Sequence, residues 1–157
     1  MQFVSTWRDP SSDRLVYFAP EVLEVFSQYI QGEQDTEAGG ILLGHVRGIH
    51  LEILEATVPT RKDRRLRLFF ERLIHGHQSI AERRWRQSKG LIRYVGEWHT
   101  HPEDHPTPSR LDVGEWQKLA AARLDGRPVL AAIVGRESLR VEYMKSDGTR
   151  HRLLTSL

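Results

Sequence analysis

The sequence predicts an α/β domain in which a mixed sheet is flanked by helices. A near-continuous apolar run at residues 129–134 has the length and composition of a central strand that is buried on both faces. Two other segments, residues 20–31 and the segment that begins at Ser109, carry apolar side chains at helical spacing. The length of 157 residues fits one domain spanning residues 1–157.

The first half of the chain predicts a strand, a helix and a hairpin of strands. Pro20 stands where the first turn of a helix tolerates proline, and Gly32 follows the last apolar position of that helix. Gly48 supplies the turn between two apolar strand segments. The expected elements are a strand at 15–18, a helix at 20–31, and strands at 39–46 and 51–58.

The second half predicts two helices and four strands. Gly90 ends the first helix, and Ser109 begins the second. Residues 59–70 mix apolar and charged side chains without a clear period, and no element is expected there. The expected elements are a helix at 71–89, a strand at 91–98, a helix from 109 onward, and strands at 129–134, 139–144 and 150–154.

The composition excludes several classes of protein. The chain has no cysteine, which excludes disulfide frameworks, thiolate zinc sites and a cysteine nucleophile. Any metal must therefore be bound by His, Asp or Glu. No run approaches the ~20 apolar residues of a membrane span, and residues 1–9 lack the apolar core of a signal peptide. We therefore expect a cytoplasmic protein that does not associate with membranes.

Two histidines, His99 and His101, stand at the end of a predicted strand. On an extended segment, residues two positions apart project from the same face. Asp112 follows His101 after a proline-rich stretch, where a turn can bring its carboxylate back to that face. Two imidazoles and one carboxylate leave the fourth position of a tetrahedral zinc ion open for water. This arrangement is typical of a hydrolase and not of a structural zinc site.

Ser109 and Asp112 have a second interpretation. A serine at the start of a helix, followed three positions later by an acidic residue, is typical of a capping box. Without the histidines, capping would be the preferred interpretation of this pair. The two interpretations are partly compatible, because the hydroxyl of Ser109 can cap the helix in the resting protein, whereas a zinc-bound Asp112 could not cap freely.

The sequence His99-x-His101-Pro102, followed after six residues by Ser109-x-x-Asp112, resembles the motif of the JAMM, or MPN-plus, family of zinc metalloproteases. The stretch Glu-Ala-Gly-Gly-Ile-Leu-Leu-Gly at 37–44 is similar to the glutamate and glycine-rich strand of that family. The sequence around the histidines, Gly-Glu-Trp-His-Thr-His-Pro, is most similar to that of small bacterial members of this family. These include the ubiquitin-like deconjugases encoded in CBASS antiphage operons.

The resemblance implies a single MPN-type domain of cytidine-deaminase-like fold, with a mixed, mostly antiparallel sheet. It assigns His99, His101 and Asp112 as zinc ligands, Glu37 as the general base, and Ser109 as a hydrogen-bond donor to the oxyanion. The implied activity is hydrolysis, by metal-activated water, of the amide bond after the C-terminus of a ubiquitin-like protein or its conjugate. The implied partners are this protein substrate and ubiquitin-transfer-like enzymes encoded beside the gene.

Two other functions remain open at this point. MPN domains that have lost their metal ligands serve as scaffolds, and a zinc peptidase of this type could instead act on small amides. All ligand positions are filled here, which favours an enzyme. A nucleobase deaminase also activates water on zinc, but its C-x-x-C element cannot occur in a chain without cysteine.

Other histidines and the arginine clusters have simpler interpretations. The clusters at 61–67 and 83–86 accompany a net charge of only +2, so we expect a solvated basic face, or a docking face for an acidic protein, and not a nucleic-acid site. His75 and His77 fall in a predicted helix, where a spacing of two directs them apart, and we expect both at the surface. His105 is expected to be a solvated loop residue.

Overall fold

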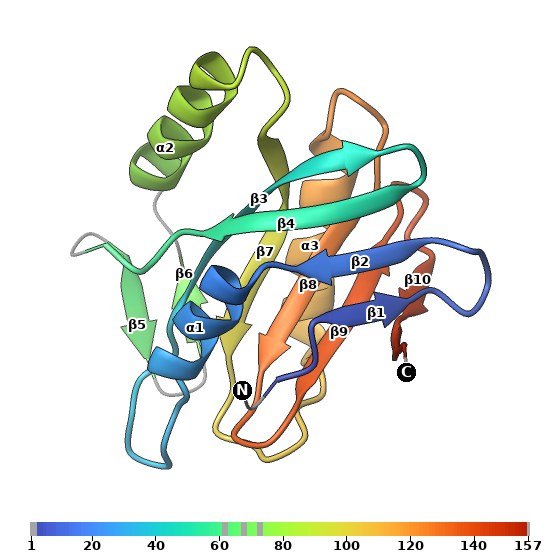
Figure 1. Cartoon of the computed structure of the whole chain (residues 1–157). Coiled ribbons are helices and arrows are strands. Elements are labelled where there is room, and N and C mark those ends of the chain that lie inside the picture. The colour runs from blue at the N-terminus through green and yellow to red at the C-terminus, as the bar shows by residue number, and fades with distance from the viewer. Residues whose placement is uncertain (1–2, 61–62, 67–68, 72–73, 157) are drawn as a thin grey trace.

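The computed structural model describes residues 3–60, 63–66, 69–71 and 74–156, whose elements are labelled in Figure 1. The helices among these residues are α1 (Pro20–Gln28), α2 (Ile74–Gln87) and α3 (Arg110–Ala122). The strands are β1 (Thr6–Arg8), β2 (Leu15–Phe18), β3 (Gly39–Arg47), β4 (His50–Ala56), β5 (Arg64–Leu66), β6 (Phe69–Glu71), β7 (Arg93–Thr100), β8 (Val129–Val134), β9 (Leu139–Met144), β10 (Arg150–Arg152) and β11 (Leu154–Thr155).

Nine strands of the described residues form one mixed sheet, in the order β10-β9-β8-β7-β3-β4-β2-β1-β11. Six of the eight strand pairs seen in it are antiparallel; the parallel pairs are β2 with β4 and β7 with β8. β10 and β11 lie on opposite edges although only the buried Leu153 separates them, so the sheet curls until its edges meet. The predicted α/β class and the mostly antiparallel sheet are confirmed.

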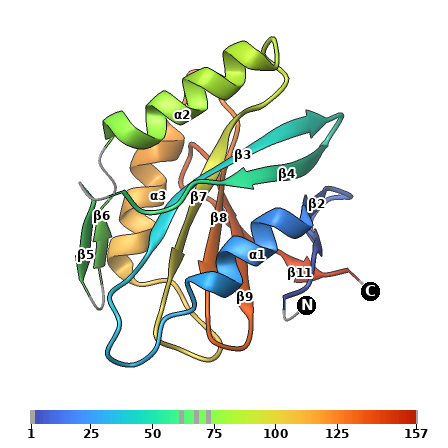
Figure 2. The same cartoon turned by 60° about the vertical axis from the view of Figure 1, so that its left-hand side comes forward.

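Helices α1 and α3 cover opposite faces of the sheet (Figures 1 and 2). Leu23 and Phe26 of α1 are buried in the larger of two apolar clusters. Trp116 of α3 belongs to the second cluster, together with Ile133 of β8. Because a helix covers each face, all six residues of β8 are buried, which explains the continuous apolar run at 129–134.

Most predicted elements occur, with shifted ends. β8 and β9 have the expected bounds, and Gly48 adopts a φ of 63° at the turn between β3 and β4. Helix α1 ends at Gln28, three residues earlier than predicted. β7 begins and ends two residues later than predicted, so His99 lies within the strand.

The shortest strands were not predicted. The segment 59–70 contains β5 and the start of β6, and because Glu71 of this hairpin pairs with Arg64, α2 begins only at Ile74. The single strand expected at 150–154 is two strands, β10 and β11, which pair with β9 and β1 respectively. Strands of two or three residues are defined by their pairing partners more than by their own composition.

The prediction that His77 lies at the surface is wrong, because this side chain is fully buried. Its Nδ1 lies 2.7 Å from Oγ1 of Thr57, and its Nε2 lies 2.8 Å from Oδ2 of Asp63. A carboxylate and a hydroxyl from the chain that follows β4 thus supply the polar partners that burial requires. The side chain of His75 lies outside the described part of the structure.

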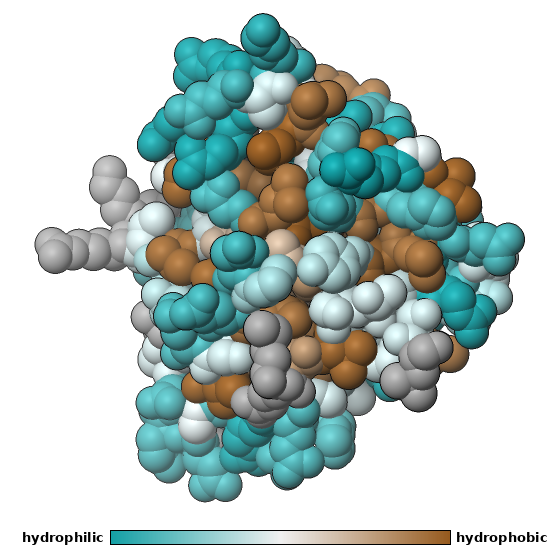
Figure 3. Space-filling model, viewed as in Figure 1, coloured by the Kyte–Doolittle hydropathy of each residue, from teal (hydrophilic) through white to brown (hydrophobic). Residues whose placement is uncertain are grey.

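Residues 83–86 lie on α2, where the surface is largely hydrophilic (Figure 3). Arg83 and Arg86 are exposed, while Arg84 donates to Oε2 of Glu55 at 2.7 Å. In the other basic cluster, residues 61, 62 and 67 fall outside the described residues. Among the helices that the structure describes, none is both long enough and apolar enough to cross a membrane.

Candidate metal centre

Strand β7 lies between β3 and β8 and carries two histidines to one end of the sheet. His99 pairs with Gly39 of β3 on one side and with Ile133 of β8 on the other. His101 follows directly after the strand, and its backbone N–H donates to the carbonyl of Val134 at 3.0 Å. The backbone at the centre of the sheet therefore fixes the positions of both residues.

The two imidazoles meet each other and two carboxylates. The Nε2 atoms of His99 and His101 lie 3.0 Å apart. Asp112 places Oδ1 3.3 Å from Nε2 of His99 and Oδ2 3.2 Å from Nε2 of His101. Oε1 of Glu37 lies 3.5 Å from the same Nε2 of His101. The structure thus brings together four of the five residues that the sequence singled out.

The separations among His99, His101 and Asp112 fit a tetrahedral zinc ion. Ligand atoms held ~2.0–2.1 Å from zinc in a tetrahedron lie roughly 3.3 Å from one another. The donor set agrees, since two imidazole nitrogens and a carboxylate oxygen are ordinary ligands of zinc. Glu37, His99 and His101 form an alternative group that could hold a metal ion, with ligand atoms within 4.8 Å of one another. The histidines belong to both groups, and only the carboxylate differs.

Glu37 is only 2% exposed, although it lies in the loop before β3. Burial raises the pKa of its carboxyl to about 8; the charge of His101 opposes this rise and the charge of Asp112 adds to it. A carboxyl whose pKa lies near neutrality can both accept and release a proton at neutral pH. The positive charge of a cation held by the neighbouring histidines would lower this pKa.

Thr100, between the two histidines, holds the backbone next to Glu37. Its Oγ1 accepts a hydrogen bond from the N–H of Ala38 at 3.0 Å and donates one to Oε1 of Gln31 at 2.9 Å. Gln31 in turn donates from Nε2 to the carbonyl of Asp35 at 2.9 Å. Thr100 and Gln31 are both buried, so water does not compete for these bonds. They tie the loop that carries Glu37 to the strand that carries the histidines.

Glu103 is a partner of His101 that the sequence analysis missed. Its Oε1 lies 2.8 Å from Nδ1 of His101. When Nδ1–H donates to this carboxylate, the ring keeps its lone pair on Nε2, the atom that faces His99 and Asp112. Metal-binding histidines nearly always have such a partner, so a carboxylate two positions after His101 was a usable signal in the sequence.

Ser109 and Asp112 form the capping box that was the second interpretation of this pair. Oγ of Ser109 accepts the N–H of Asp112 at 3.1 Å, and Oδ2 of Asp112 accepts the N–H of Ser109 at 2.8 Å. Burial alone would raise the pKa of Asp112, but its contacts with the imidazoles of His101 and His99 outweigh burial and hold this pKa well below its usual range. Asp112 therefore serves both the start of α3 and the histidine pair.

Gly40 allows β3 to approach the chain after β4. A Cβ at this position would lie 2.2 Å from the carbonyl oxygen of Thr57, closer than real side-chain carbons come. Thr57 accepts the N–H of Ile41 on Oγ1, which also contacts the buried His77. Its carbonyl accepts the indole N–H of Trp98 at 2.8 Å. The glycine, the threonine and the buried histidine therefore set the path of β3 just after Glu37.

His105 lies apart from this cluster, as expected of a solvated loop residue. Its side chain is 72% exposed, and its Nδ1 lies 2.9 Å from Oγ of Ser138. Nε2 lies 3.5 Å from a carboxylate oxygen of Glu137, which is also exposed. Ion pairs at this exposure contribute little to stability.

Comparisons with known proteins identify relatives of this chain. A family model described as prokaryotic homologs of the JAB domain matches residues 19–146. The chain is 51% identical, over 94% of each chain, to a CD-NTase/cGAS isopeptidase of Pseudomonas aeruginosa. It is 39% identical, over 86% of each chain, to a protein of the same name from Escherichia coli. The solution structure of a Desulfitobacterium hafniense protein has a similar fold, with a TM-score of 0.61 at 17% identity, covering 87% of this chain and 88% of that one.

Proposed function

The chain belongs to the prokaryotic JAB family, and from this premise we propose that it is a zinc-dependent isopeptidase. The proposed reaction is hydrolysis of the amide bond that joins the C-terminus of a ubiquitin-like protein to its conjugate. Relatives that bear the name isopeptidase cover almost the whole chain at up to 51% identity, which supports an isopeptide bond as the target.

One observation carries the proposal: Nε2 of His99, Nε2 of His101 and the carboxylate of Asp112 converge at the spacing of tetrahedral zinc ligands. We assign these three residues as the ligands, because they match the family motif and an oxygen of Asp112 lies within 3.3 Å of each histidine. Glu37 is left beside the ligand set as a second carboxylate, 3.5 Å from Nε2 of His101.

The chain's own groups handle protons and orientation in the proposed reaction. Zinc, when bound, supplies a Lewis acid that lowers the pKa of a water molecule toward ~7 and polarises a carbonyl. Glu37 takes the proton of the attacking water and passes it to the amine that leaves. Glu103 holds the ring of His101 through Nδ1, and the hydroxyl of Ser109 donates a hydrogen bond to the developing oxyanion.

The metal centre alone does not distinguish an isopeptide bond from a peptide bond, since both are amides attacked at the same kind of carbonyl. The separating experiment offers the zinc-loaded protein three substrates: a ubiquitin-like protein joined to a lysine side chain, the same protein in a linear fusion, and a small acylated amine. We expect the lysine-linked conjugate to be cleaved fastest. Chelation should stop the cleavage, and added zinc should restore it.

Each contrary result has a specific meaning. Equal cleavage of all three substrates would contradict a ubiquitin-like specificity and favour a peptidase of small amides. Failure to cleave any of them by zinc-loaded protein would favour the scaffold role that other MPN domains have. Cleavage that survives chelation would contradict the metal-dependent mechanism itself.

A further inference from the structure

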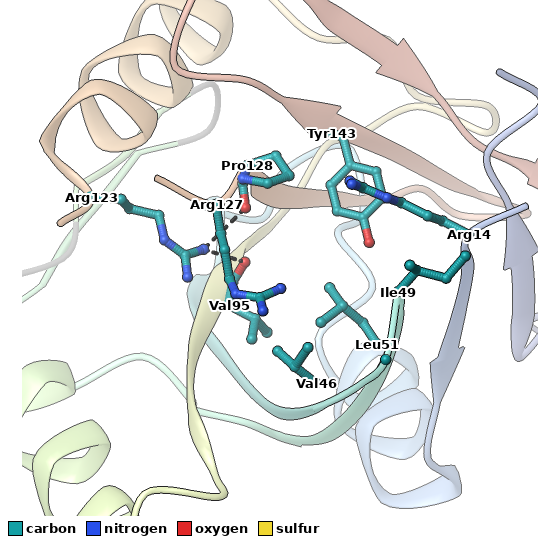
Figure 4. A pocket seen from close by; sticks show the side chains of 10 residues that line it. Arg14, Val46, Ile49, Leu51, Val95, Arg123, Arg127, Pro128 and Tyr143 are labelled. Carbon is teal, nitrogen blue, oxygen red and sulfur yellow. Dashed lines mark hydrogen bonds between the residues drawn. The ribbon is translucent and has the colours of Figure 1, made fainter. Parts of the chain in front are cut away.

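A pocket of about 250 Å³ lies between the β3–β4 hairpin, the start of β7 and the chain before β8 (Figure 4). The tip of the β3–β4 hairpin contributes an apolar wall that includes Val46, Ile49 and Leu51. Arg14 comes from the loop between β1 and β2, Arg127 from the chain before β8, and Tyr143 from β9. A wall that is apolar on one side and cationic on the other suits an amphiphilic anion.

Tyr143 places its hydroxyl in this pocket. The residue is 3% exposed, and its phenol oxygen points into the cavity (Figure 4). Among the described residues nothing forms a hydrogen bond with this hydroxyl. Burial raises the pKa of Tyr143 above its ordinary value, so the phenol stays protonated and can donate. Its oxygen opens onto the pocket, so water or a ligand can be its hydrogen-bond partner.

Arg14 and Arg127 bring two positive charges to the same place. Both guanidiniums are close enough to Tyr143 to act electrostatically on its hydroxyl; the carboxylate of Asp9 acts on it with the opposite sign, but is itself bound by Ser11. In the part of the chain that the structure describes, neither guanidinium forms a salt bridge or a hydrogen bond with a carboxylate. Arg123 in the same wall is already bound within the protein. Its Nη2 lies 2.7 Å from Oδ2 of Asp125, and its Nη1 donates to the carbonyl of Pro128 at 3.0 Å. Arg14 and Arg127 therefore remain the more available cations of this wall, although the charge of Asp125 also acts on Arg127.

We propose that this pocket binds a phosphate monoester carried on a small apolar body. The two unpaired guanidiniums match the charge of a phosphate, ≈ −1.5 to −2 at neutral pH, better than that of a carboxylate. Phosphate oxygens also accept hydrogen bonds from guanidinium and phenol donors together. The apolar wall of Val46, Ile49 and Leu51 is left for the organic part of the ligand.

The size of the pocket limits the ligand. Its volume corresponds to about eight water molecules at ~30 Å³ each, which is the size of a phosphorylated phenol or of one phosphorylated side chain. The ligand is therefore either a free small ester or a single modified residue of another protein. Both have the same chemistry at the arginines and at Tyr143.

The pocket does not depend on the proposed isopeptidase activity. Val95 lines it from β7, and four residues of extended strand, roughly 13 Å, separate Val95 from His99. A ligand of this size that contacts Tyr143 does not also reach the histidine pair. Failure of the metal-centre assignment would therefore leave this proposal standing, and the reverse is also true.

The test is calorimetric titration of the protein with phenyl phosphate at low salt. Phosphate also binds metals, so the titration is performed on the His99→Ala/His101→Ala variant as well as on the native chain. We expect both to bind phenyl phosphate. In the double-variant background, Arg14→Gln and Arg127→Gln should each weaken binding by roughly 10-fold or more, and Tyr143→Phe by about 2–10-fold.

Arg83→Gln is the matched control, because it removes one exposed arginine on α2 without touching the pocket. It should leave the affinity unchanged. An equal loss in Arg83→Gln would overturn the proposal, because it would show a response to net charge alone. Binding that disappears in the histidine double variant would overturn it too, because the phosphate would then reside at the metal centre.

Further ligands test whether the pocket prefers a phosphate, and whether that phosphate belongs to a free ester or to a modified protein. Inorganic phosphate should bind more weakly than phenyl phosphate, because it leaves the apolar wall uncovered. Benzoate should also bind more weakly, and tighter binding of benzoate would contradict the choice of a phosphate. A phosphotyrosine peptide that binds more tightly than phenyl phosphate would assign the pocket to a modified protein, and weaker binding would assign it to a free ester.

Discussion

His77 and His101 are both buried histidines with a carboxylate oxygen 2.8 Å from one ring nitrogen. They differ at the other nitrogen. Nδ1 of His77 meets the hydroxyl of Thr57 at 2.7 Å, so both of its ring nitrogens have partners within the protein. Nε2 of His101 instead faces the Nε2 of His99 at 3.0 Å, and two carboxylates lie close to it.

The difference teaches that a carboxylate partner orients a histidine without revealing its role. The surroundings of the second nitrogen are informative. A hydroxyl there completes a buried network, as around His77. An imidazole and several carboxylate oxygens converging on one point leave lone pairs facing each other, and a bound cation relieves that arrangement. His77 is therefore interpreted as structural and His101 as a metal ligand.

The largest effect that tests this contrast is loss of the metal. The native protein should bind about one zinc ion per chain, and His99→Ala/His101→Ala should bind none and hydrolyse nothing. The fold should persist, because the apolar clusters on both faces of the sheet do not include these residues. Elemental analysis and circular dichroism on the same samples measure both. Zinc retained at the native level would contradict the ligand assignment.

Replacement of the proposed base should have the next largest effect. Glu37→Gln should keep zinc but hydrolyse ~10²–10⁴-fold more slowly, because an amide cannot accept the proton of water. The amide has nearly the shape of the carboxyl, so the buried site should not rearrange. Single-turnover cleavage by zinc-loaded protein is the measurement. A near-native rate would show that another group acts as the base.

The sequence predicted the parts of the fold that depend on a continuous pattern. β8 is buried on both faces, and its sequence is a continuous apolar run. α1 is buried on one face, and its apolar residues recur at helical spacing. β1 and β11 have no such pattern. They pair through Trp7 and Thr155, which lie at opposite ends of the chain, and nothing local indicates that contact.

The same limit applies at the candidate site. His99, His101 and Asp112 were found because their spacing resembles a family motif, and Glu37 because a glycine-rich strand follows it. The burial of His77 was missed because its partner Asp63 comes from a segment without a recognisable element. Its burial depends on a tertiary contact, whereas the candidate ligands could be proposed from their resemblance to a family motif.

Ser109→Ala tests whether the capping box is also part of the catalytic machinery. If the hydroxyl donates to the oxyanion, the cleavage rate should fall by ~10²–10³-fold, the loss typical of one such donor. If it only caps α3, stability should fall by ~0.5–2 kcal/mol and the rate per folded molecule should not change. We expect the loss of rate to dominate. Thermal unfolding and single-turnover cleavage, measured on one zinc-loaded sample, separate the two roles.

The smallest effect on catalysis is expected at His77. This substitution tests most directly whether His77 is structural while His101 binds the metal. His77→Ala should leave zinc content and the rate per folded molecule unchanged, because the two ring nitrogens contact Thr57 and Asp63 and not a ligand of the metal centre. It removes one of the donors to the fully buried carboxylate of Asp63, which keeps the N–H of Thr60 at 2.7 Å, and a hydrogen bond to a charged group contributes about 1.5–3 kcal/mol. The melting temperature should fall by about 2–4 °C for each kcal/mol lost.

His77→Gln provides the matched control for that loss. A glutamine amide can both donate and accept, so it should restore part of the network between Thr57 and Asp63 and part of the melting temperature. Loss of zinc in His77→Ala, restored by glutamine, would mean that this network holds the metal ligands in place through Gly40 and β3. The two buried histidines would then belong to one system, and the distinction drawn from their second nitrogens would fail.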